Sequence, residues 1–511
     1  MSSTESNKLI ARNSIFMSIR MTMILLVTLY TTRVVLSVLG VTDYGVYNVV
    51  CGFVSMFVFL NTSMSNGIQR FFNYELARNR IENVREVYNV ALFIQVILVV
   101  LVIVLTETLG LWYLHHKMNL PPDRMEAAEW IFQFSVLSFV FVILQVPFAA
   151  AIMAHEKMNY YALVGVLDAM LKLSIALVLP YVQSDRLIVY GALLAMISVV
   201  NFILYYIYAK RNFSEIRLHL HFNLNVFQSI ASFSGWNIFG SFSHMMKEQG
   251  LNLVLNLFFG PVVNAARGVV AQVNAGLESF VQNISVPVRP QVVQSYAAGN
   301  KERTMRLMFS VSKLSCILLY LLSLPILYET DFLLKLWLSD DVPAHTSSFL
   351  VITIAVSFLN SLNASVSSVV HASGKMRNYQ VFSSLAVLLA VPLAYVVLHW
   401  GYSAECALWM SFFSMLLAQV VSLMILKTIV DYSVADYLKS ILWPFALVVG
   451  ITFWMPYLVH LYVQPGFVRF VLTCAVSLAG ISLTVYLLAL NRTEKELVDG
   501  MLRRVVNLRH E

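Results

Sequence analysis

The sequence predicts an all-α polytopic membrane protein with about fourteen transmembrane helices, and three observations support this fold class. Of the 511 residues, 59% are hydrophobic and only 12% are charged, whereas a soluble chain is about 25% charged. Apolar runs of about 20 residues, long enough for a helix to cross a bilayer, recur along the whole chain. The loops between these runs are short, so no soluble catalytic domain is expected among them.

The apolar runs place six spans in the first half of the chain, six in the second half and two at the C-terminal end. Backbone groups in lipid must hydrogen-bond within their own segment, so each run is expected to be a helix. The expected spans are residues 13–39, 43–66, 87–112, 128–153, 161–182, 187–209, 226–258, 262–287, 307–329, 346–370, 379–400, 405–426, 441–463 and 467–490. The first run is too long for a signal peptide and is expected to be retained.

The loop charges predict the orientation of the spans. Most Lys and Arg residues outside the spans lie in the terminal segments and in the loops on the same side. Since basic loops stay in the cytoplasm, both chain ends are expected there. The same bias accounts for the net charge of +7, which therefore does not indicate a nucleic-acid partner.

An internal repeat divides the chain. The pattern A-x-x-K-M-x-x-Y occurs at Ala154–Tyr161 and again at Ala372–Tyr379. A second set of matches, nearly in the same register, pairs Gly40 with Gly260, Ser65 with Ser285 and Glu82 with Glu302. Two six-helix bundles of the same orientation are therefore expected, the repeat arrangement of several transporter folds. A duplicated scaffold without a transport role is the alternative.

The expected parts follow from this repeat. Residues 1–225 form the N-terminal bundle and residues 226–440 the C-terminal bundle, followed by two additional helices in residues 441–490. Residues 491–511 place apolar side chains on one helical face and carry Arg503 and Arg504, which predicts an amphipathic helix on the cytoplasmic membrane surface.

Several kinds of chemistry are not expected. The four cysteines lie in or beside apolar runs with no C-x-x-C spacing, and His219 and His221 have no companion ligands, so neither a disulfide nor a metal is expected. Walker A, G-x-G-x-x-G and H-E-x-x-H motifs are absent, which disfavours an ATP-driven pump in one chain. No cofactor is expected.

Basic residues inside the spans are the candidate substrate-binding residues, because a charge at mid-membrane costs about 2.5–3.5 kcal/mol. Of the six basic residues inside the spans, Arg20, Arg33, Lys247 and Arg267 are the candidates. The other two are Lys172, which lies four residues from Asp168, and Lys313, which lies near a span end. The three arginines lie near span ends, where snorkelling to the interface is the alternative. For Lys247, neutralisation by its neighbour Glu248 is the alternative, although adjacent helical residues do not face each other.

Acidic and amide residues complete the expected cavity. Glu248 and Glu278 are the candidates for a coupling-ion site, whereas Asp168 and Lys172, four residues apart, are expected to form an ion pair within one helix. The spans that hold the basic residues also carry polar side chains expected to line a cavity, namely Asn61, Asn66, Asn237, Gln272 and Asn283. A net basic, polar cavity would suit a phosphate headgroup with hydroxyl-rich attachments, because the arginine fork matches phosphate oxygens.

Five short motifs stand at fixed places relative to the spans. They are Leu39-Gly40 with Asp43-Tyr44-Gly45, Gly67-Ile68-Gln69-Arg70, Ala154-His155-Glu156-Lys157-Met158-Asn159, Leu334-Lys335-Leu336-Trp337-Leu338 and Ala372-Ser373-Gly374-Lys375. Each motif alone is weak, and their order and positions make the set specific. Over residues 10–490 or so, the chain resembles the bacterial polysaccharide transporters, the oligosaccharide (O-antigen) flippases of the MOP (MATE-like) superfamily.

This resemblance implies a V-shaped pair of bundles around a basic central cavity in a bacterial cytoplasmic (inner) membrane. It implies a flippase that moves polyprenyl-pyrophosphate-linked oligosaccharide to the outer leaflet for O-antigen, lipopolysaccharide, capsule or exopolysaccharide assembly. The expected partners are this lipid-linked oligosaccharide, membrane lipid and other polysaccharide-assembly membrane proteins, and the chain is expected to be a monomer. No bond is made or broken, so it is not expected to be an enzyme.

Three alternatives remain. A cation-coupled multidrug antiporter of the same superfamily would carry acidic cavity residues for cationic drugs. A polysaccharide polymerase or ligase would need a large outer catalytic loop, which is missing. A major-facilitator sugar porter would carry a G-x-x-x-D-R-x-G-R-R-like loop after the second span, where this chain reads Gly67-Ile68-Gln69-Arg70-Phe71-Phe72-Asn73-Tyr74.

Overall fold

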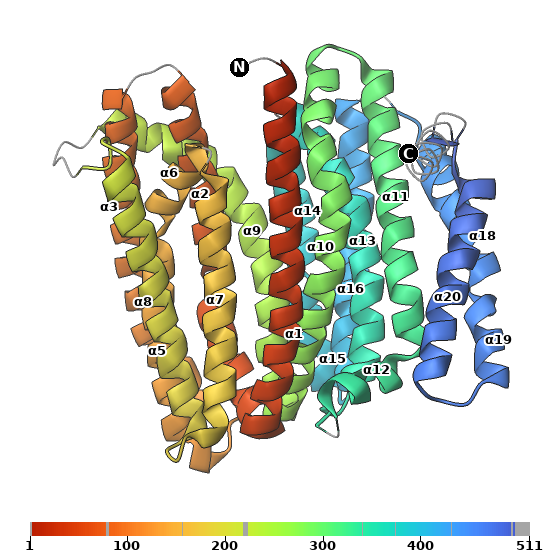
Figure 1. Ribbon diagram of the computed structural model, residues 1–511, viewed down its shortest axis with the longest axis horizontal. Helices are drawn as coiled ribbons and strands as arrows, with labels where there is room; N and C mark the ends of the chain where they lie inside the picture. The colour runs from red at the N-terminus through yellow and green to blue at the C-terminus, as the bar shows by residue number, and fades with distance from the viewer. Residues whose placement is uncertain are drawn as a thin grey trace, which may run out of the picture. The chain divides into compact units, whose positions relative to one another are not determined.

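A computed structural model describes residues 3–77, 81–155, 157–217, 223–339, 341–373, 375–430, 432–491 and 494–495. This part of the chain is helical and contains no strand, as predicted (Figure 1). The helices of the first half are α1 (Ser3–Ser55), α2 (Val58–Ala77), α3 (Ile81–Leu105), α4 (Leu111–His116), α5 (Met125–Leu144), α6 (Val146–Ala154), α7 (Met158–Val178) and α8 (Arg186–Asn212).

The second half continues in the same way. Its helices are α9 (Leu224–Phe259), α10 (Pro261–Ala297), α11 (Lys301–Tyr328), α12 (Thr330–Leu338), α13 (Thr346–Ser373), α14 (Met376–Leu388), α15 (Ala390–His399), α16 (Ala404–Ile429), α17 (Val434–Tyr437), α18 (Trp443–Thr452), α19 (Trp454–Tyr462) and α20 (Phe467–Thr484). Short π-helical or 3₁₀ turns are η1 (Thr106–Gly110), η2 (Pro122–Arg124), η3 (Leu179–Tyr181), η4 (Leu438–Leu442) and η5 (Val485–Ala489).

The helices coincide with the expected spans, and the chain is a multi-pass membrane protein. Among the described residues, eleven helices are long and apolar enough to cross a membrane, so the expected number of fourteen is not confirmed. Helices α9 and α10 are outside this group because charged and amide side chains interrupt their apolar runs. Polar helices of this kind are tolerated in a membrane where they face protein or water.

The predicted pairing of Gly40 with Gly260 is confirmed at the level of the backbone. Gly40 breaks α1 with φ 76° and ψ 169°, and Gly260 separates α9 from α10 with φ 75° and ψ −170°. This region of backbone space is accessible almost only to glycine. In each half of the chain, a glycine with positive φ therefore separates the first two expected spans.

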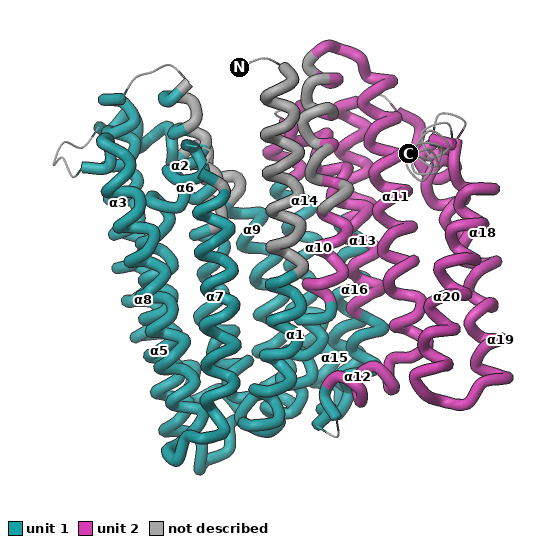
Figure 2. Tube along the Cα trace, viewed as in Figure 1, with its two compact units in different colours: residues 1–273, 338–352, 380–418 teal, residues 274–337, 353–379, 419–511 magenta. Residues whose placement is uncertain are grey.

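The helices form two compact units, shown in Figure 2. Unit 1 comprises residues 1–273, 338–352 and 380–418, and unit 2 comprises residues 274–337, 353–379 and 419–511. The expected division at residues 225, 440 and 490 stays a prediction. The expected amphipathic tail lies outside the described residues, apart from Asn491, Glu494 and Lys495.

Each unit has its own apolar core. In unit 1, α1 packs against α5 and α7, α5 packs against α8, and α2 packs against α6 and α9. In unit 2, α20 packs against α11, α18 and α19. Large apolar side chains also cover many outward faces, such as those of Leu26, Trp443 and Leu478, as expected for helices that contact lipid rather than water.

Ion pairs hold the helix ends of unit 1. Arg124 donates two hydrogen bonds to the Asp43 carboxylate, at 2.7 and 2.6 Å, and two to the Asp185 carboxylate, at 2.7 and 3.2 Å. Asp185 also caps the N-terminus of α8 by accepting a hydrogen bond from the Leu187 backbone N–H at 2.9 Å. A side-chain cap of this kind supplies one of the bonds that the first helical turn lacks. One arginine thus joins α1, the start of α5 and the start of α8.

Two further ion pairs fix loops. In unit 1, His155 Nε2 lies 2.5 Å from Glu215 Oε1, and its ring stacks on Phe213. In unit 2, the buried Lys313 Nζ donates to Glu494 Oε2 at 2.6 Å and to the Ala489 carbonyl at 2.8 Å. The second pair ties the segment after η5 to α11.

Candidate functional site

Unit 1 contains a cavity of about 440 Å³, which is within the usual size range of small-ligand sites. Its walls come from α1, α7, α8, α9 and the first part of α10. The lining is rich in hydroxyl and amide groups, contributed by Thr28, Thr31, Thr32, Asn48, Ser55, Gln249, Asn252 and Gln272. Gln272 is the one expected polar residue among the described side chains of this lining.

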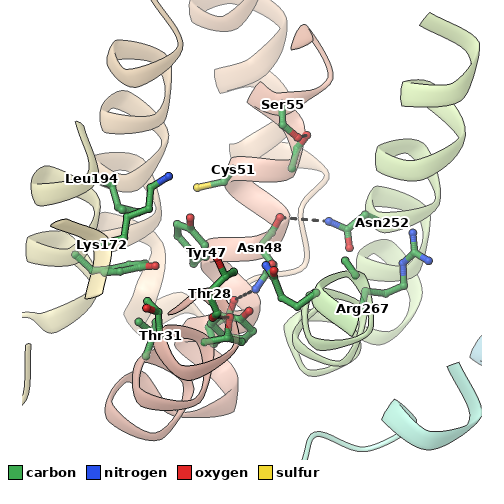
Figure 3. Close-up of a pocket in the computed structure, with 18 of the residues that line it drawn as sticks. Thr28, Thr31, Tyr47, Asn48, Cys51, Ser55, Lys172, Leu194, Asn252 and Arg267 are labelled. Atoms are coloured by element: carbon green, nitrogen blue, oxygen red, sulfur yellow. Dashed lines mark hydrogen bonds between the residues drawn. The ribbon is translucent and has the colours of Figure 1, made fainter. Parts of the chain in front are cut away.

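Helix α1 supplies the centre of this lining because hydroxyl residues recur on one of its faces. Thr28, Thr31 and Thr32 follow the spacing of a single helical face. The Asn252 amide donates to the Asn48 carbonyl at 3.2 Å, and the Asn48 amide donates to the Tyr44 carbonyl at 2.7 Å. Figure 3 shows Lys172 and Arg267 on opposite sides of this face of α1.

Aromatic rings close one side of the cavity. Tyr44, Tyr47 and Tyr190 all line it, and the rings of Tyr47 and Tyr190 meet edge to face at 5.1 Å between centroids. The Thr31 hydroxyl oxygen is buried and has no hydrogen-bond partner among the described residues. An unpaired buried hydroxyl is costly, so a ligand that bonds to it would gain that energy.

One carboxylate on α9 holds two of the predicted cations. Glu248 Oε1 lies 2.9 Å from Lys247 Nζ, and Glu248 Oε2 lies 3.2 Å from Arg267 Nη2. Lys247 is 1% exposed, whereas the Glu248 side chain is 52% exposed. The structure therefore contains the Lys247–Glu248 contact that helix geometry made unexpected, because both long side chains bend toward each other. Arg267 lines the cavity, and Lys247 is outside its lining.

The predicted ion pair on α7 is confirmed. Lys172 Nζ lies 2.8 Å from Asp168 Oδ2, and the Asn201 amide donates to Asp168 Oδ1 at 2.7 Å. Both members of the pair line the cavity, together with Glu248 and Arg267. The described lining thus has as many acidic as basic side chains, which differs from the expected basic excess. The expectation weighed four basic residues against Asp43, Glu248 and Glu278, whereas the described lining omits Arg33 and Lys247 and includes Asp168 and Lys172 from α7.

The other expected site residues lie elsewhere. Arg33 is exposed and donates to the Ser339 hydroxyl at 3.0 Å. Asn61 lies outside the cavity lining, and its amide oxygen is buried without a hydrogen-bond partner among the described residues. The side chains of Arg20, Asn66, Asn237 and Asn283 are outside the described part of the structure.

Glu278 lies in unit 2 and has different surroundings from Glu248. Its Oε1 atom accepts hydrogen bonds from Asn274 Nδ2 at 3.2 Å, Ser357 Oγ at 3.3 Å and Asn360 Nδ2 at 3.3 Å. Among the described residues, the partners of Glu248 are two cations, whereas the partners of Glu278 are neutral. The structure therefore separates the two candidates for a coupling ion.

Sequence reasoning missed the hydroxyl and tyrosine part of the cavity. It ranked span residues by charge, and the spacing of Thr28, Thr31 and Thr32 was a signal that could have identified the lining face. The described residues contain no group of three or more His, Cys, Asp or Glu side chains that could hold a metal ion.

Comparisons of the sequence with known proteins give one family match. The MatE family model matches residues 238–396. No curated protein sequence matches the chain.

Solved structures match over most of the chain. The lipid II flippase MurJ in an inward closed conformation has a TM-score of 0.72 and 12% identity, over 93% of this chain and 98% of that one. An inward-facing multidrug resistance MATE family transporter of the MOP superfamily has a TM-score of 0.69 and 14% identity, over 84% of this chain and 99% of that one. A MOP superfamily transporter from Pyrococcus furiosus, described as having a binding pocket of reverse polarity, has a TM-score of 0.60 and 14% identity, over 84% and 96%. The chain therefore has the fold of the MOP superfamily transporters.

Proposed function

We propose that this protein is a flippase that moves polyprenyl-pyrophosphate-linked oligosaccharide from the cytoplasmic to the outer leaflet for surface polysaccharide assembly. The observation that carries the proposal is the extent of the structural matches. The MATE transporter is covered almost completely but leaves about a sixth of this chain unmatched, whereas the lipid II flippase accounts for 93% of it. Part of the chain that the MATE transporter leaves unmatched is therefore matched by the lipid II flippase.

The chemistry of the cavity supports a sugar-containing headgroup. Hydroxyl and amide side chains from α1, α9 and α10 offer donors and acceptors for sugar hydroxyls, and Tyr47 and Tyr190 offer apolar ring surface. The Thr31 hydroxyl, which has no hydrogen-bond partner among the described residues, is a group to which a glycan can bond. The described lining holds two acidic and two basic side chains, Asp168 and Glu248 against Lys172 and Arg267. Because these charges balance, the lining would suit a neutral sugar better than a strongly charged one.

Glu248 suggests how the pyrophosphate is taken up. Its half-exposed carboxylate occupies the position of an anion beside Lys247 and Arg267. A pyrophosphate with more charge and more acceptor oxygens competes with this carboxylate for the Arg267 fork. The substrate then exchanges for a tethered counter-ion, so two buried cations are never left unpaired.

The remaining steps follow alternating access. The lipid tail stays in the bilayer, isomerisation exposes the headgroup to the other side, and no bond is made or broken. The loop charges support a topology with both termini in the cytoplasm. A monomer in the bacterial cytoplasmic membrane is proposed on the resemblance to the oligosaccharide flippases. Other polysaccharide-assembly proteins are its proposed neighbours.

The test is flipping in liposomes. A labelled polyprenyl-pyrophosphate oligosaccharide is supplied with an external enzyme that modifies only outer-leaflet headgroups. Wild type is expected to accelerate modification, and Arg267→Ala to reduce the rate by about tenfold or more, as loss of one charged hydrogen bond implies. Lys335→Ala, on the exposed side of α12, is the matched control and should flip like wild type. No acceleration with several glycans would overturn the proposal.

A cation-coupled multidrug antiporter is the second candidate, and two observations favour it. The MatE model matches residues 238–396, and the carboxylates of Asp168 and Glu248 line the cavity, where a cationic drug could bind. Export of a fluorescent cation from loaded vesicles, without any flipping, would select this function. A polymerase or ligase activity would instead appear as longer glycans in the same assay.

A further inference from the structure

Unit 2 contains another cavity, of about 460 Å³, which the proposed transport function does not use. Its walls come from the start of α11, from α17 and η4, and from the residue that follows the end of the last span. All three segments belong to helices that are long and apolar enough to cross a membrane, and the cavity lies where these helices begin or end. It therefore lies at the membrane surface.

Apolar side chains beside the cavity indicate its level in the membrane. Trp443, the first residue after η4, is 64% exposed, and Leu438 on η4 is also exposed. Tryptophan is enriched where lipid headgroups meet the hydrocarbon. Ser433, Asp436 and Ser440 line the cavity and precede Trp443 at the start of the same span. These three polar residues thus lie on the headgroup side of Trp443.

The face of α11 that lines the cavity changes character along the helix. Lys301 and Arg306, near its start, are exposed, whereas Met305 is buried and Phe309 is half-buried. Lys301, Met305 and Phe309 follow one another at intervals of four residues, which keeps them on one helical face. A charged mouth that continues into an apolar wall suits an amphiphile.

The charges at the mouth of the cavity balance. Lys301 and Arg306 are basic, and Glu302 and Asp436 are acidic. The side chains of Arg306 and Glu302 are 67% and 83% exposed, so water weakens their ion pair and a ligand can compete for the arginine. Asp436 is exposed and forms no ion pair with another described residue. Lys313, deeper along α11, is already held in the ion pair described above.

We propose that this cavity binds the headgroup of a membrane phospholipid in which a phosphodiester is joined to a primary ammonium group, as in phosphatidylethanolamine. The Arg306 fork and the Lys301 ammonium group attract the phosphodiester oxygens. The Asp436 carboxylate accepts hydrogen bonds from the ammonium group of the lipid. A zwitterionic headgroup matches two cations and two carboxylates, whereas a purely anionic headgroup would also be repelled by both carboxylates.

The bound lipid joins parts of unit 2 that are far apart in the sequence. Its phosphodiester lies on α11 and its ammonium group on α17, so it holds the start of the C-terminal helices against α11. Ser440, which also lines the cavity, belongs to the π-helical turn η4. Turns of this kind are frequent at functional sites. The lipid is therefore expected to stabilise the fold of unit 2.

Binding is tested on delipidated full-length protein in detergent. Phosphatidylethanolamine, its N-methylated forms and phosphatidylcholine, with identical acyl chains, differ in the number of N–H donors at the headgroup. The apparent Tm is expected to rise most with phosphatidylethanolamine, because a ligand of the folded state stabilises it. The half-saturating concentration should increase with each added methyl group. Equal stabilisation by phosphatidylethanolamine and phosphatidylcholine, or a stronger effect of phosphatidylglycerol, would overturn the proposal.

Variants assign the two ends of the headgroup. Asp436→Asn is expected to weaken binding of phosphatidylethanolamine by about tenfold, the scale of a hydrogen bond to a charged group, and to leave phosphatidylcholine unaffected. A merely structural defect would weaken both lipids alike. Arg306→Ala is expected to weaken both, since they share the phosphodiester. Lys427→Ala removes an exposed cation at the end of α16, outside the cavity lining, and should bind like wild type.

The contradicting outcomes are equally specific. Asp436→Asn with an unchanged preference for phosphatidylethanolamine, or Arg306→Ala with normal binding of both lipids, would overturn the proposal. Asp436→Asn keeps the test decisive if Arg306→Ala fails to fold.

Soluble glycerophosphoethanolamine distinguishes a membrane lipid from a free headgroup compound. It carries the same phosphodiester and ammonium group but has no acyl chain to bury against Met305 and Phe309, so it is expected to bind much more weakly. Stabilisation by the soluble compound at the same concentration as the lipid would overturn the assignment to a membrane lipid. None of these measurements depends on flipping, so their outcome is independent of the proposed function.

Discussion

Gly40 and Gly260 adopt the same backbone conformation, with φ values of 76° and 75° and ψ values of 169° and −170°. Both residues stand where one long helix ends and the next begins. A Cβ at Gly40 would meet no atom within 4 Å, and one at Gly260 would meet only Asn119 at ordinary contact distance. The requirement for glycine at both breaks therefore comes from backbone geometry and not from crowding.

Gly40→Ala and Gly260→Ala are expected to destabilise the protein by similar amounts. A residue with a Cβ pays about 1–3 kcal/mol to occupy this backbone region. The measurement is the apparent Tm of each purified variant in the same detergent.

Gly450→Ala is the matched control for these two variants. Gly450 is inside α18, and its Cβ would also meet open space. Alanine there is expected to leave the apparent Tm unchanged or to raise it, since alanine favours a helix. A large loss at Gly450, or none at Gly40 and Gly260, would contradict the backbone explanation.

Glu248→Gln is expected to destabilise the protein because it leaves the ammonium group of Lys247 buried without an anion. Breaking a buried ion pair costs about 3–5 kcal/mol, and the half-exposed carboxylate places this case near the lower end. The double variant Lys247→Met with Glu248→Gln should recover part of the loss. Thermal unfolding of the single and double variants measures both effects, and an additive double variant would show that the two residues do not interact.

Thr31→Val is expected to leave stability unchanged or improved and to slow transport. The hydroxyl of Thr31 is buried and has no partner among the described residues, so removing it relieves an unpaired polar group. Thr32→Val is the comparison, because the Thr32 hydroxyl donates to the Thr28 carbonyl at 2.9 Å and its loss costs about 0.5–1.5 kcal/mol. Equal effects of the two variants on Tm and on flipping would argue against a ligand at Thr31.

The lowered pKa of Glu215 leads us to expect that the protein is less stable in acid. Burial alone would raise the pKa of its carboxyl, but hydrogen bonds from His155 and the backbone outweigh burial, and the pKa lies below the usual 4.5. The unfolded chain then takes up the proton more readily than the folded one. The contribution of this group is present above about pH 4.5 and is lost as the pH falls through the folded pKa.

Glu215→Gln tests this pH dependence. The variant should be less stable than wild type at neutral pH and should lose less on acidification, in unfolding curves recorded between about pH 7 and pH 4. Glu302→Gln, in an exposed pair, should follow the wild-type pH dependence. If wild type and Glu215→Gln lose the same stability in acid, the pair with His155 is not responsible.

Much of the fold could be predicted from the sequence because lipid allows few solutions for an apolar run. Helices coincide with the expected spans, and the pairing of Gly40 with Gly260 emerged from the internal repeat alone. The ion pair of Asp168 with Lys172 was predictable because its spacing brings the two side chains together within one helix.

The composition of the cavity was harder to predict. The Lys247–Glu248 contact depends on how two flexible side chains bend, and the contact of Arg267 with Glu248 depends on how α9 meets α10. Neither is encoded in a local spacing. The hydroxyl of Thr31 is distinguished from that of Thr32 only by its partners in the folded chain.

The tie between Lys313 and Glu494 bears on how the protein is handled in the laboratory. A shortened gene that stops at the end of η5 would look harmless, since Ala489 closes the last membrane segment. It would nevertheless remove the anion that faces Lys313, whose side chain is 3% exposed. Affinity tags and fluorescent fusions therefore belong beyond Lys495, and truncation boundaries before Glu494 are expected to lower expression yield.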